Sequence, residues 1–199
     1  MLKKTFLLAS FLVVTCFAKA QEIYVNKKES EVTIITAKGE KISGKTRYSF
    51  IADLQEEIVF YNKQNEMQVF RPFEIQGFVL EGKQFTSMEQ KGLLMGLNHF
   101  FLHQQNAGSM KLYTLYFLEN PGMTETQEYY VQKGNDKIYG VKSFRFINFR
   151  KEMSSFVSEV PELAKRIADK TYTASDIETI VDEYNGYLEA SIETTSIGK

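Results

Sequence analysis

The sequence is poor in the residue types that carry most catalytic and metal chemistry. Among its 199 residues are one cysteine, two histidines, three prolines and no tryptophan. The one cysteine, Cys16, lies in an N-terminal segment that we expect to be removed, and without it the mature chain has neither a disulfide nor a thiol nucleophile. Stability must then come from the apolar core, which a chain of this length can build.

The first twenty residues have the three parts of a secretory signal peptide. Lys3 and Lys4 give a positive start, followed by an apolar run over residues 5–17. Residues 18–20 (Ala-Lys-Ala) place small side chains where a signal peptidase recognises them, and cleavage there leaves Gln21 as the new N-terminus. Because the apolar run is shorter than the ~20 residues that cross a bilayer, we expect no transmembrane segment in the mature chain. The expected location is the periplasm, the cell envelope or the extracellular space.

Lipidation at Cys16 is the alternative to cleavage after Ala20. A lipoprotein signal places Gly, Ala or Ser directly before the cysteine, whereas this sequence has Thr15 there. The apolar run also continues past the cysteine to Phe17. Cleavage after Ala20 is therefore the prediction, and an acylated N-terminal Cys16 is the outcome that would overturn it.

The charge balance argues against nucleic acid as a partner. Removing residues 1–20 takes away three of the 24 basic residues and none of the 25 acidic ones, which leaves a mature net charge near −4. Binding to nucleic acid needs a basic stripe that displaces counterions, and the sequence has no cluster of lysine and arginine. We therefore expect no nucleic-acid partner.

Residues 23–139 have the pattern of antiparallel strands, with short apolar or alternating runs between turn residues. Pro72 lacks a ladder donor and should end its strand or place it at a sheet edge. Residues 88–97 contain two glycines within an apolar stretch, and we expect them to form a connecting loop. Residues 111–118 are apolar on both faces, which predicts a central strand covered on both sides. The expected strands are 32–36, 42–48, 57–61, 67–70, 77–80, 84–87, 100–104, 111–118 and 128–132.

The later part of the chain has a helical pattern. From Phe146 onward, apolar residues recur at helical spacing. Pro161 suits the first turn of a second helix, where its missing N–H would have no partner in any case. Residues 175–178 (Ser-Asp-Ile-Glu) have the sequence of a capping box and should open a third helix. Residues 191–199 are polar and are expected to form a flexible tail.

This order, strands first and helices last, indicates an α+β fold in which helices cover one face or one end of a sheet. The β-rich domain is expected over residues 21–140, as an antiparallel β-sheet or as a partly closed barrel of hairpins. A segment of two to three helices, packed on the sheet, is expected over residues 141–190.

The sequence predicts no catalytic residue, no cofactor and no metal site. His99 and His103 have the spacing of a helical zinc pair, but they lie in a predicted strand, where residues four apart are about 13 Å from each other. No nucleophile elbow occurs, and no phosphate-binding glycine loop. The paired carboxylates match no known catalytic motif, and we interpret them as charges on solvent-exposed faces and loops.

The tyrosines of the later strands are the candidate partner-binding surface. Tyr113, Tyr116, Tyr129 and Tyr130 could stack on a sugar or a peptide. The competing interpretation is structural, because cross-strand aromatic pairs commonly stabilise a sheet. As a binding surface, these tyrosines would receive an envelope protein or a glycan.

A set of stretches spread over most of the mature chain carries a resemblance to a known family. They are residues 39–44, 72–78, 112–116, 149–152, 161–163 and 180–185. In this order they resemble a family of exported envelope proteins of Gram-negative bacteria to which no activity is assigned. One departure is Glu74, where relatives are expected to have Asp, and the change keeps the charge. The resemblance implies an envelope address and an interaction role, and it supplies no catalytic residue.

The leading hypothesis is an exported, non-catalytic domain that binds a partner in the envelope. One alternative is an exported hydrolase whose site is assembled from residues distant in sequence, which a cleft with two carboxylates about 5 to 9 Å apart would favour. The other is an accessory subunit of an outer-membrane barrel, which would dock through a sheet edge or through the aromatic strand 111–118.

The mass of the exported protein tests the predicted leader. We expect the intact mass of a chain that begins at Gln21, recovered from the envelope fraction of a Gram-negative host. An Ala20→Arg variant, which lacks the small residue at the cleavage site, should retain the leader. A mass that matches an acylated chain beginning at Cys16 would contradict cleavage after Ala20.

Overall fold

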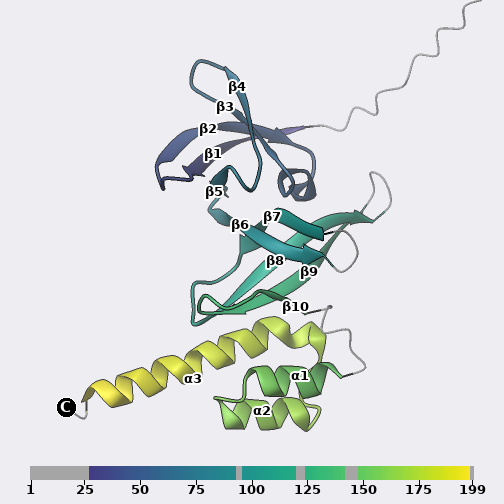
Figure 1. Cartoon of the computed structure of the whole chain (residues 1–199), viewed down its shortest axis with the longest axis vertical. Coiled ribbons are helices and arrows are strands. Elements are labelled where there is room, and N and C mark those ends of the chain that lie inside the picture. Colours follow the sequence, from purple (N-terminus) through teal and green to yellow (C-terminus); the bar gives the residue numbers. More distant parts are fainter. Residues whose placement is uncertain (1–26, 93–95, 120–123, 142–147, 198–199) are drawn as a thin grey trace, which may run out of the picture.

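The structure is a computed structural model that describes residues 27–92, 96–119, 124–141 and 148–197. The expected signal peptide over residues 1–20, including Cys16, lies outside the described residues. Within them the chain forms one ten-stranded antiparallel sheet followed by three α-helices (Figure 1). This is the α+β architecture that the sequence predicts, and of the two forms considered the sheet is open and not closed into a barrel.

The strands and helices have the following bounds. The strands are β1 (Lys28–Thr36), β2 (Lys41–Tyr48), β3 (Ile58–Tyr61), β4 (Met67–Phe70), β5 (Ile75–Leu80), β6 (Lys83–Gly92), β7 (Gly96–Gln104), β8 (Met110–Glu119), β9 (Thr124–Lys133) and β10 (Tyr139–Gly140). The helical elements are the 3₁₀ turns η1 (Ile51–Leu54) and η2 (Ala174–Asp176) and the helices α1 (Phe149–Phe156), α2 (Pro161–Ala168) and α3 (Ile177–Ile197). The strand order is β10-β9-β8-β7-β6-β5-β1-β2-β3-β4. All neighbours are consecutive in the chain except β5, which returns to pair with β1.

The interpretation of residues 88–97 as a connecting loop is wrong. Strands β6 and β7 form a long hairpin whose pairing runs from Gln84↔Gln104 to Gly92↔Gly96. The two glycines that suggested a break are opposite each other at the end of this hairpin. They therefore mark a reversal of the chain between two paired strands.

Strand β4 ends where the sequence predicts, and a turn at Pro72 leads into β5. Strand β4 lies at an edge of the sheet and ends before Pro72. The main-chain N–H of Arg71 donates to the Glu74 carboxylate at 2.7 Å, which closes the turn. Gly77 then has φ +153°, and a Cβ on it would lie 2.0 Å from the carbonyl oxygen of Phe85. Only glycine fits this close approach, and the register between β1 and β5 shifts at this point.

The described residues build two main apolar cores, one in each half of the sheet. The first core is built from residues of β1–β7 and η1, in the half of the sheet that curls. The second core lies between β8–β9 and the helices. The helices gather at the end of the sheet away from β1–β4 (Figure 1). The first core contains Val32, Ile34, Tyr48, Leu54, Ile58, Phe60, Ile75, Phe78, Leu80, Phe85 and Phe101. The second contains Met110, Leu112, Val131, Val141, Met153, Val157, Val160, Leu163, Ile167, Tyr172, Ile177, Ile180, Val181 and Tyr184. A smaller cluster of Leu102, Tyr113 and Tyr130 lies on the other face of β7–β9.

The helices α2 and α3 pack against each other through a charged contact. Helix α2 begins at Pro161, as predicted. Arg166 of α2 pairs with Glu183 of α3, and the same carboxylate accepts the Tyr172 hydroxyl at 2.5 Å. Helix α3 continues to Ile197, beyond the expected boundary near residue 190. Among the described residues, no helix combines the length and the apolar character that crossing a membrane requires.

The start of α3 differs from the prediction. Residues 175–178 do not form the expected capping box. The Asp176 carboxylate instead accepts the main-chain N–H of Thr173 at 2.8 Å and its hydroxyl at 2.7 Å. Glu178 accepts the hydroxyl of Tyr129 at 2.9 Å. Because Thr173 is extended and η2 makes the first turn, the cap lies two residues earlier than the prediction placed it.

Asn185 ties α3 to the beginning of β8. Its amide oxygen accepts the N–H of Met110 at 2.8 Å, and its amide nitrogen donates to the Met110 carbonyl at 2.9 Å. Both residues are buried. A Cβ on Gly108 would lie 2.4 Å from the same amide, so residue 108 must be glycine for Asn185 to reach the strand. The amide therefore bonds to β8 as a residue of a neighbouring strand would.

Removing this amide should cost stability without changing the fold. We expect Asn185→Ala to lower the free energy of unfolding by about 2 kcal/mol, because the buried Met110 N–H loses its partner. Urea denaturation followed by circular dichroism measures the change, and the matched control is Asn148→Ala. Asn148 is exposed and its side chain makes no capping bond, so this control should stay within about 0.5 kcal/mol of the parent. Equal stability of the two variants would contradict the role of Asn185.

Candidate functional site

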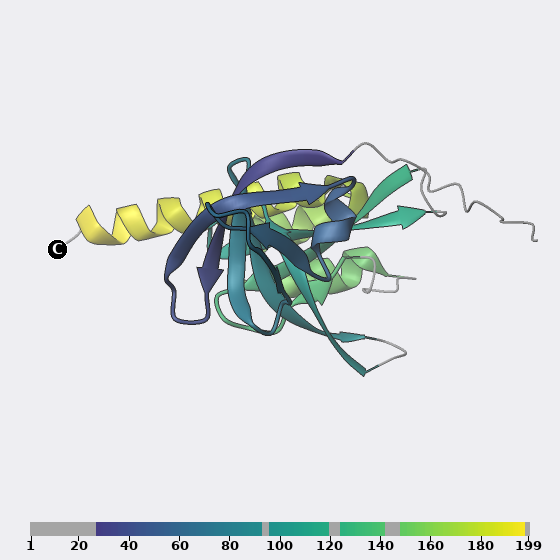
Figure 2. The same ribbon diagram turned by 90° about the horizontal axis from the view of Figure 1, so that it is seen from above.

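Strands β7 and β8 are neighbours in the sheet but separate after a short contact. Among the described residues they pair at His103↔Thr114 and Gln104↔Tyr113 only. In contrast, β6–β7 and β8–β9 stay paired over nine and ten residues. Figure 2 shows the two hairpins running apart towards their tips. The sheet is therefore split along the line between β7 and β8.

Gln55 fills the point at which the two strands separate. On the side of β7, the main-chain carbonyl of Gln55 accepts the N–H of Phe101 at 2.9 Å, and its side-chain amide nitrogen donates to the Phe101 carbonyl at 2.7 Å. On the other side the same nitrogen donates to the Thr114 carbonyl at 3.3 Å, and its amide oxygen accepts the N–H of Tyr116. Gln55 is only 1 % exposed. One residue thus takes the place of a strand between β7 and β8.

The turn before Gln55 holds it in this position. Asp53 of η1 accepts the main-chain N–H groups of residues 49 and 50, at 3.3 and 3.0 Å. The N–H of Ala52 has no partner inside so short a turn, and it donates to Glu125 of β9 at 2.8 Å. The turn η1 is therefore bound to the β8–β9 hairpin, and Gln55 follows it into the split.

Beyond Gln55, main-chain groups of both strands face the open split. In an antiparallel ladder, alternate residues direct their N–H and C=O groups to the same neighbour. Phe101 and Tyr116 direct theirs to Gln55, so His99 and Leu118, two residues further along, direct theirs into the split as well. Neither has a hydrogen-bond partner there among the described residues. Such open strand edges are ready to pair with another chain.

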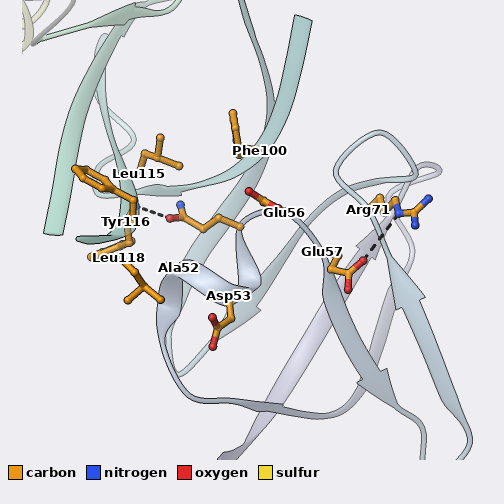
Figure 3. A pocket seen from close by; sticks show the side chains of 11 residues that line it. Ala52, Asp53, Glu56, Glu57, Arg71, Phe100, Leu115, Tyr116 and Leu118 are labelled. Atoms are coloured by element: carbon orange, nitrogen blue, oxygen red, sulfur yellow. Dashed lines mark hydrogen bonds and ion pairs between the residues drawn. The ribbon is translucent and has the colours of Figure 1, made fainter. Parts of the chain in front are cut away.

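The split opens into a groove of about 730 Å³. Its apolar lining includes Phe100 from β7 and Leu115 from β8 on one face of the sheet, and Leu118 from β8 on the opposite face, with Tyr116. Figure 3 shows Leu118 on the side of Ala52 and Asp53, whereas Glu56 lies nearer to Phe100. The lining residues are Ala52, Asp53, Gln55, Glu56, Glu57, Arg71, Phe100, Leu115, Tyr116, Phe117 and Leu118.

Carboxylates predominate along the rim of this groove. Asp53, Glu56 and Glu57 are all exposed. Arg71 is the single basic residue among the lining residues, and its Nε lies 3.9 Å from the Glu57 carboxylate. The rim therefore carries a net negative charge in contact with water.

The closed end of the split contains a histidine between two aromatic rings. His103 stacks on Phe85 and Tyr116, with ring centroids 5.3 and 6.1 Å away, and its Nδ1 lies 3.0 Å from the Tyr116 hydroxyl. Burial, and then the charge of Lys83, lower the pKa of His103. The imidazole is therefore neutral at pH 7 and serves in packing. His99 is exposed on the same strand, and among the described residues no three potential metal ligands converge.

The four tyrosines of the predicted surface do not share one face of the sheet. Tyr113 and Tyr130 are directly opposite each other across β8 and β9, and both are buried, at 2 % and 4 % exposed. Tyr129 is opposite Thr114 and lies, with Tyr116, on the face that carries the helices. Only Tyr116 lines the groove.

The groove itself could not be predicted from the sequence. Gln55 is bonded to residues 46 to 61 positions away, and a glutamine beside two glutamates has the appearance of a surface turn. Phe100 and Leu115 follow the alternation of ordinary strands. A comparison with known proteins finds no matching family model, no matching curated protein and no matching solved structure.

Replacing Gln55 should open the split further. We expect Gln55→Leu to lower the free energy of unfolding by about 3 kcal/mol, because the Phe101 and Thr114 carbonyls and the Tyr116 N–H lose their partner. Urea denaturation measures this change, and hydrogen exchange at the Tyr116 amide should become faster. Gln68→Leu, at an exposed glutamine of β4, is the matched control and should stay within about 0.5 kcal/mol of the parent. An unchanged Tyr116 exchange rate in Gln55→Leu would show that the bridge does not hold this position.

Proposed function

We propose that this chain is an exported, non-catalytic binding domain of the bacterial cell envelope, and that it holds an extended segment of a partner protein between β7 and β8. The observation that carries the proposal is the pair of open strand edges inside the sheet, at His99 and Leu118. A segment in β conformation can bond to both edges at once, which is the β-augmentation mode of peptide recognition. The export part of the proposal rests on the signal-peptide pattern of residues 1–20.

The bonds of Gln55 support an extended chain as the occupant. This residue already pairs with β7 on one side and with β8 on the other. The gap at Gln55 is therefore wide enough for one intervening residue, and the hairpins diverge from there (Figure 2). A bound segment would continue outward from Gln55 and pair next with His99 and Leu118.

A protein partner is better supported than a glycan. Sugar recognition by stacking needs the face of an aromatic ring to be accessible, and the rings of Tyr113 and Tyr130 are buried. The groove instead offers apolar side chains, Phe100 and Leu115, beside open main-chain groups. This combination suits a peptide, whose own main chain supplies matching donors and acceptors.

A hydrolase is less well supported by the same groove. A carboxyl that acts as a general acid needs burial or a close like charge to keep its proton near neutral pH. Asp53, Glu56 and Glu57 are all exposed. Asp53 also accepts two main-chain bonds, and Glu57 pairs with Arg71. These arrangements suit a charged rim better than an acid–base pair.

An accessory subunit of an outer-membrane barrel is one form of this proposal, in which the partner is the barrel protein. Affinity purification from detergent-solubilised envelopes separates this form from a partner of another kind. The accessory-subunit form predicts that the same barrel protein is recovered with the parent chain and lost with a variant whose groove is blocked. Equal recovery by both chains would place the contact outside the groove.

Hydrogen exchange with model peptides tests the groove. The probes are three capped peptides in which valine alternates with lysine, serine or glutamate. In the free protein we expect fast exchange at the amides of His99 and Leu118, because they face the open split. With at least one peptide, exchange at both amides should slow by about tenfold or more, as for newly paired strand amides.

A charge in the groove should block this binding. We expect Leu115→Asp to weaken peptide binding by about tenfold or more, or about 1.4 kcal/mol. The matched control is Val69→Asp, at an exposed apolar residue of β4, which should keep the parent affinity, and circular dichroism verifies that both variants are folded. Slow exchange at His99 and Leu118 in the free protein, or no binding of any of the peptides, would overturn the proposal.

A further inference from the structure

If a segment binds between β7 and β8, as the proposed function states, the groove also restricts which side chains that segment can carry. Successive side chains of a strand point to opposite faces of its sheet. A segment between β7 and β8 would therefore direct every second side chain to the face of Phe100 and Leu115. The remaining side chains would point to the opposite face, where η1 lies.

The first of these faces is apolar. Phe100 and Leu115 are half-buried and pack against the cluster of Leu102, Tyr113 and Tyr130. The hydroxyl of Tyr113 is already bonded to Gln132 at 3.0 Å. The contacts that this face offers to a neighbouring strand are with hydrocarbon, so it suits valine, isoleucine or leucine.

The second face is acidic. Asp53 of η1 lines the groove on this side, Glu56 follows it at the rim, and Glu125 of β9 accepts the N–H of Ala52. Arg71 is the one basic residue among the lining residues, and it lies beside Glu57. The carboxylates of Asp53 and Glu56 have no basic partner among the described residues.

Two further carboxylates, those of Glu125 and Glu178, act on the ionisation of Tyr116. Tyr116 lies on the same face, at the inner end of the groove. Burial raises the pKa of its hydroxyl, and the negative charges of Glu125 and Glu178 raise it further. The same carboxylates that disfavour a phenolate would favour a cation nearby.

We infer that the bound segment is an extended stretch in which apolar residues alternate with lysine or arginine. Its apolar side chains would cover Phe100 and Leu115, and its basic side chains would reach Asp53 and Glu56. Long basic side chains suit this rim, because their hydrocarbon stems can lie along Leu118 while their charged ends stay in water. Charge complementarity of this kind sets which partner is accepted more than how tightly it binds.

The ranking of the three valine peptides tests the inference. Isothermal titration calorimetry at low salt measures the three affinities. We expect the lysine peptide to bind about tenfold more tightly than the serine peptide, and the glutamate peptide to bind most weakly. The advantage of the lysine peptide should shrink as ionic strength rises, because exposed charges are screened. Glu56→Gln should reduce the preference for lysine over serine by about threefold.

A remote variant with the same change of charge is the control. Glu189→Gln, at an exposed glutamate of α3, should leave the preference unchanged. Equal affinities for the three peptides, with slowed exchange at His99 and Leu118, would overturn the inference while the proposed function stands. Binding of none of them would overturn both. A lysine preference that survives in Glu56→Gln and in an Asp53→Asn, Glu56→Gln double variant would place the cation elsewhere and overturn the inference.

Discussion

The arrangement of this sheet depends on the side-chain amide of Gln55. An interior strand normally has both of its edges paired, and a buried main-chain group without a partner costs about 1–3 kcal/mol. At the split between β7 and β8, one glutamine satisfies groups of both strands while it is almost fully buried. The split can therefore begin inside the sheet without leaving its inner end unpaired.

Strands β7 and β8 contribute to different main cores. Phe101 of β7 belongs to the first core, which the curled strands β1–β7 enclose, whereas Leu112 of β8 belongs to the core under the helices. Each hairpin follows the core that its own side chains help to build. Asn185 reinforces this division, because it attaches the start of β8 to α3. Strand β8 is thus held by one amide at Met110 and by another at Tyr116, and beyond the second amide its edge is open.

A groove made in this way differs from an exposed edge strand. An edge such as β4 can pair with a segment on one side only, whereas the split offers two edges and walls of different chemistry. Phe100 and Leu115 give the groove an apolar wall, and the exposed Asp53 and Glu56 place charge at its rim. These features suit recognition of an extended chain.

The sequence by itself determined the order of strands and helices, the helix start at Pro161 and the turn that begins at Pro72. Periodicity and turn chemistry are local, so they can be recognised in a short window. Two local predictions were wrong, because Gly92 and Gly96 lie opposite each other across a hairpin and because Thr173, not Ser175, caps the 3₁₀ turn that leads into the last helix. Only the tertiary structure decided that β5 returns to β1, that β7 and β8 separate, and that Gln55 bridges them. Each of these features depends on contacts between groups that are tens of residues apart, so no short stretch of the sequence can show them.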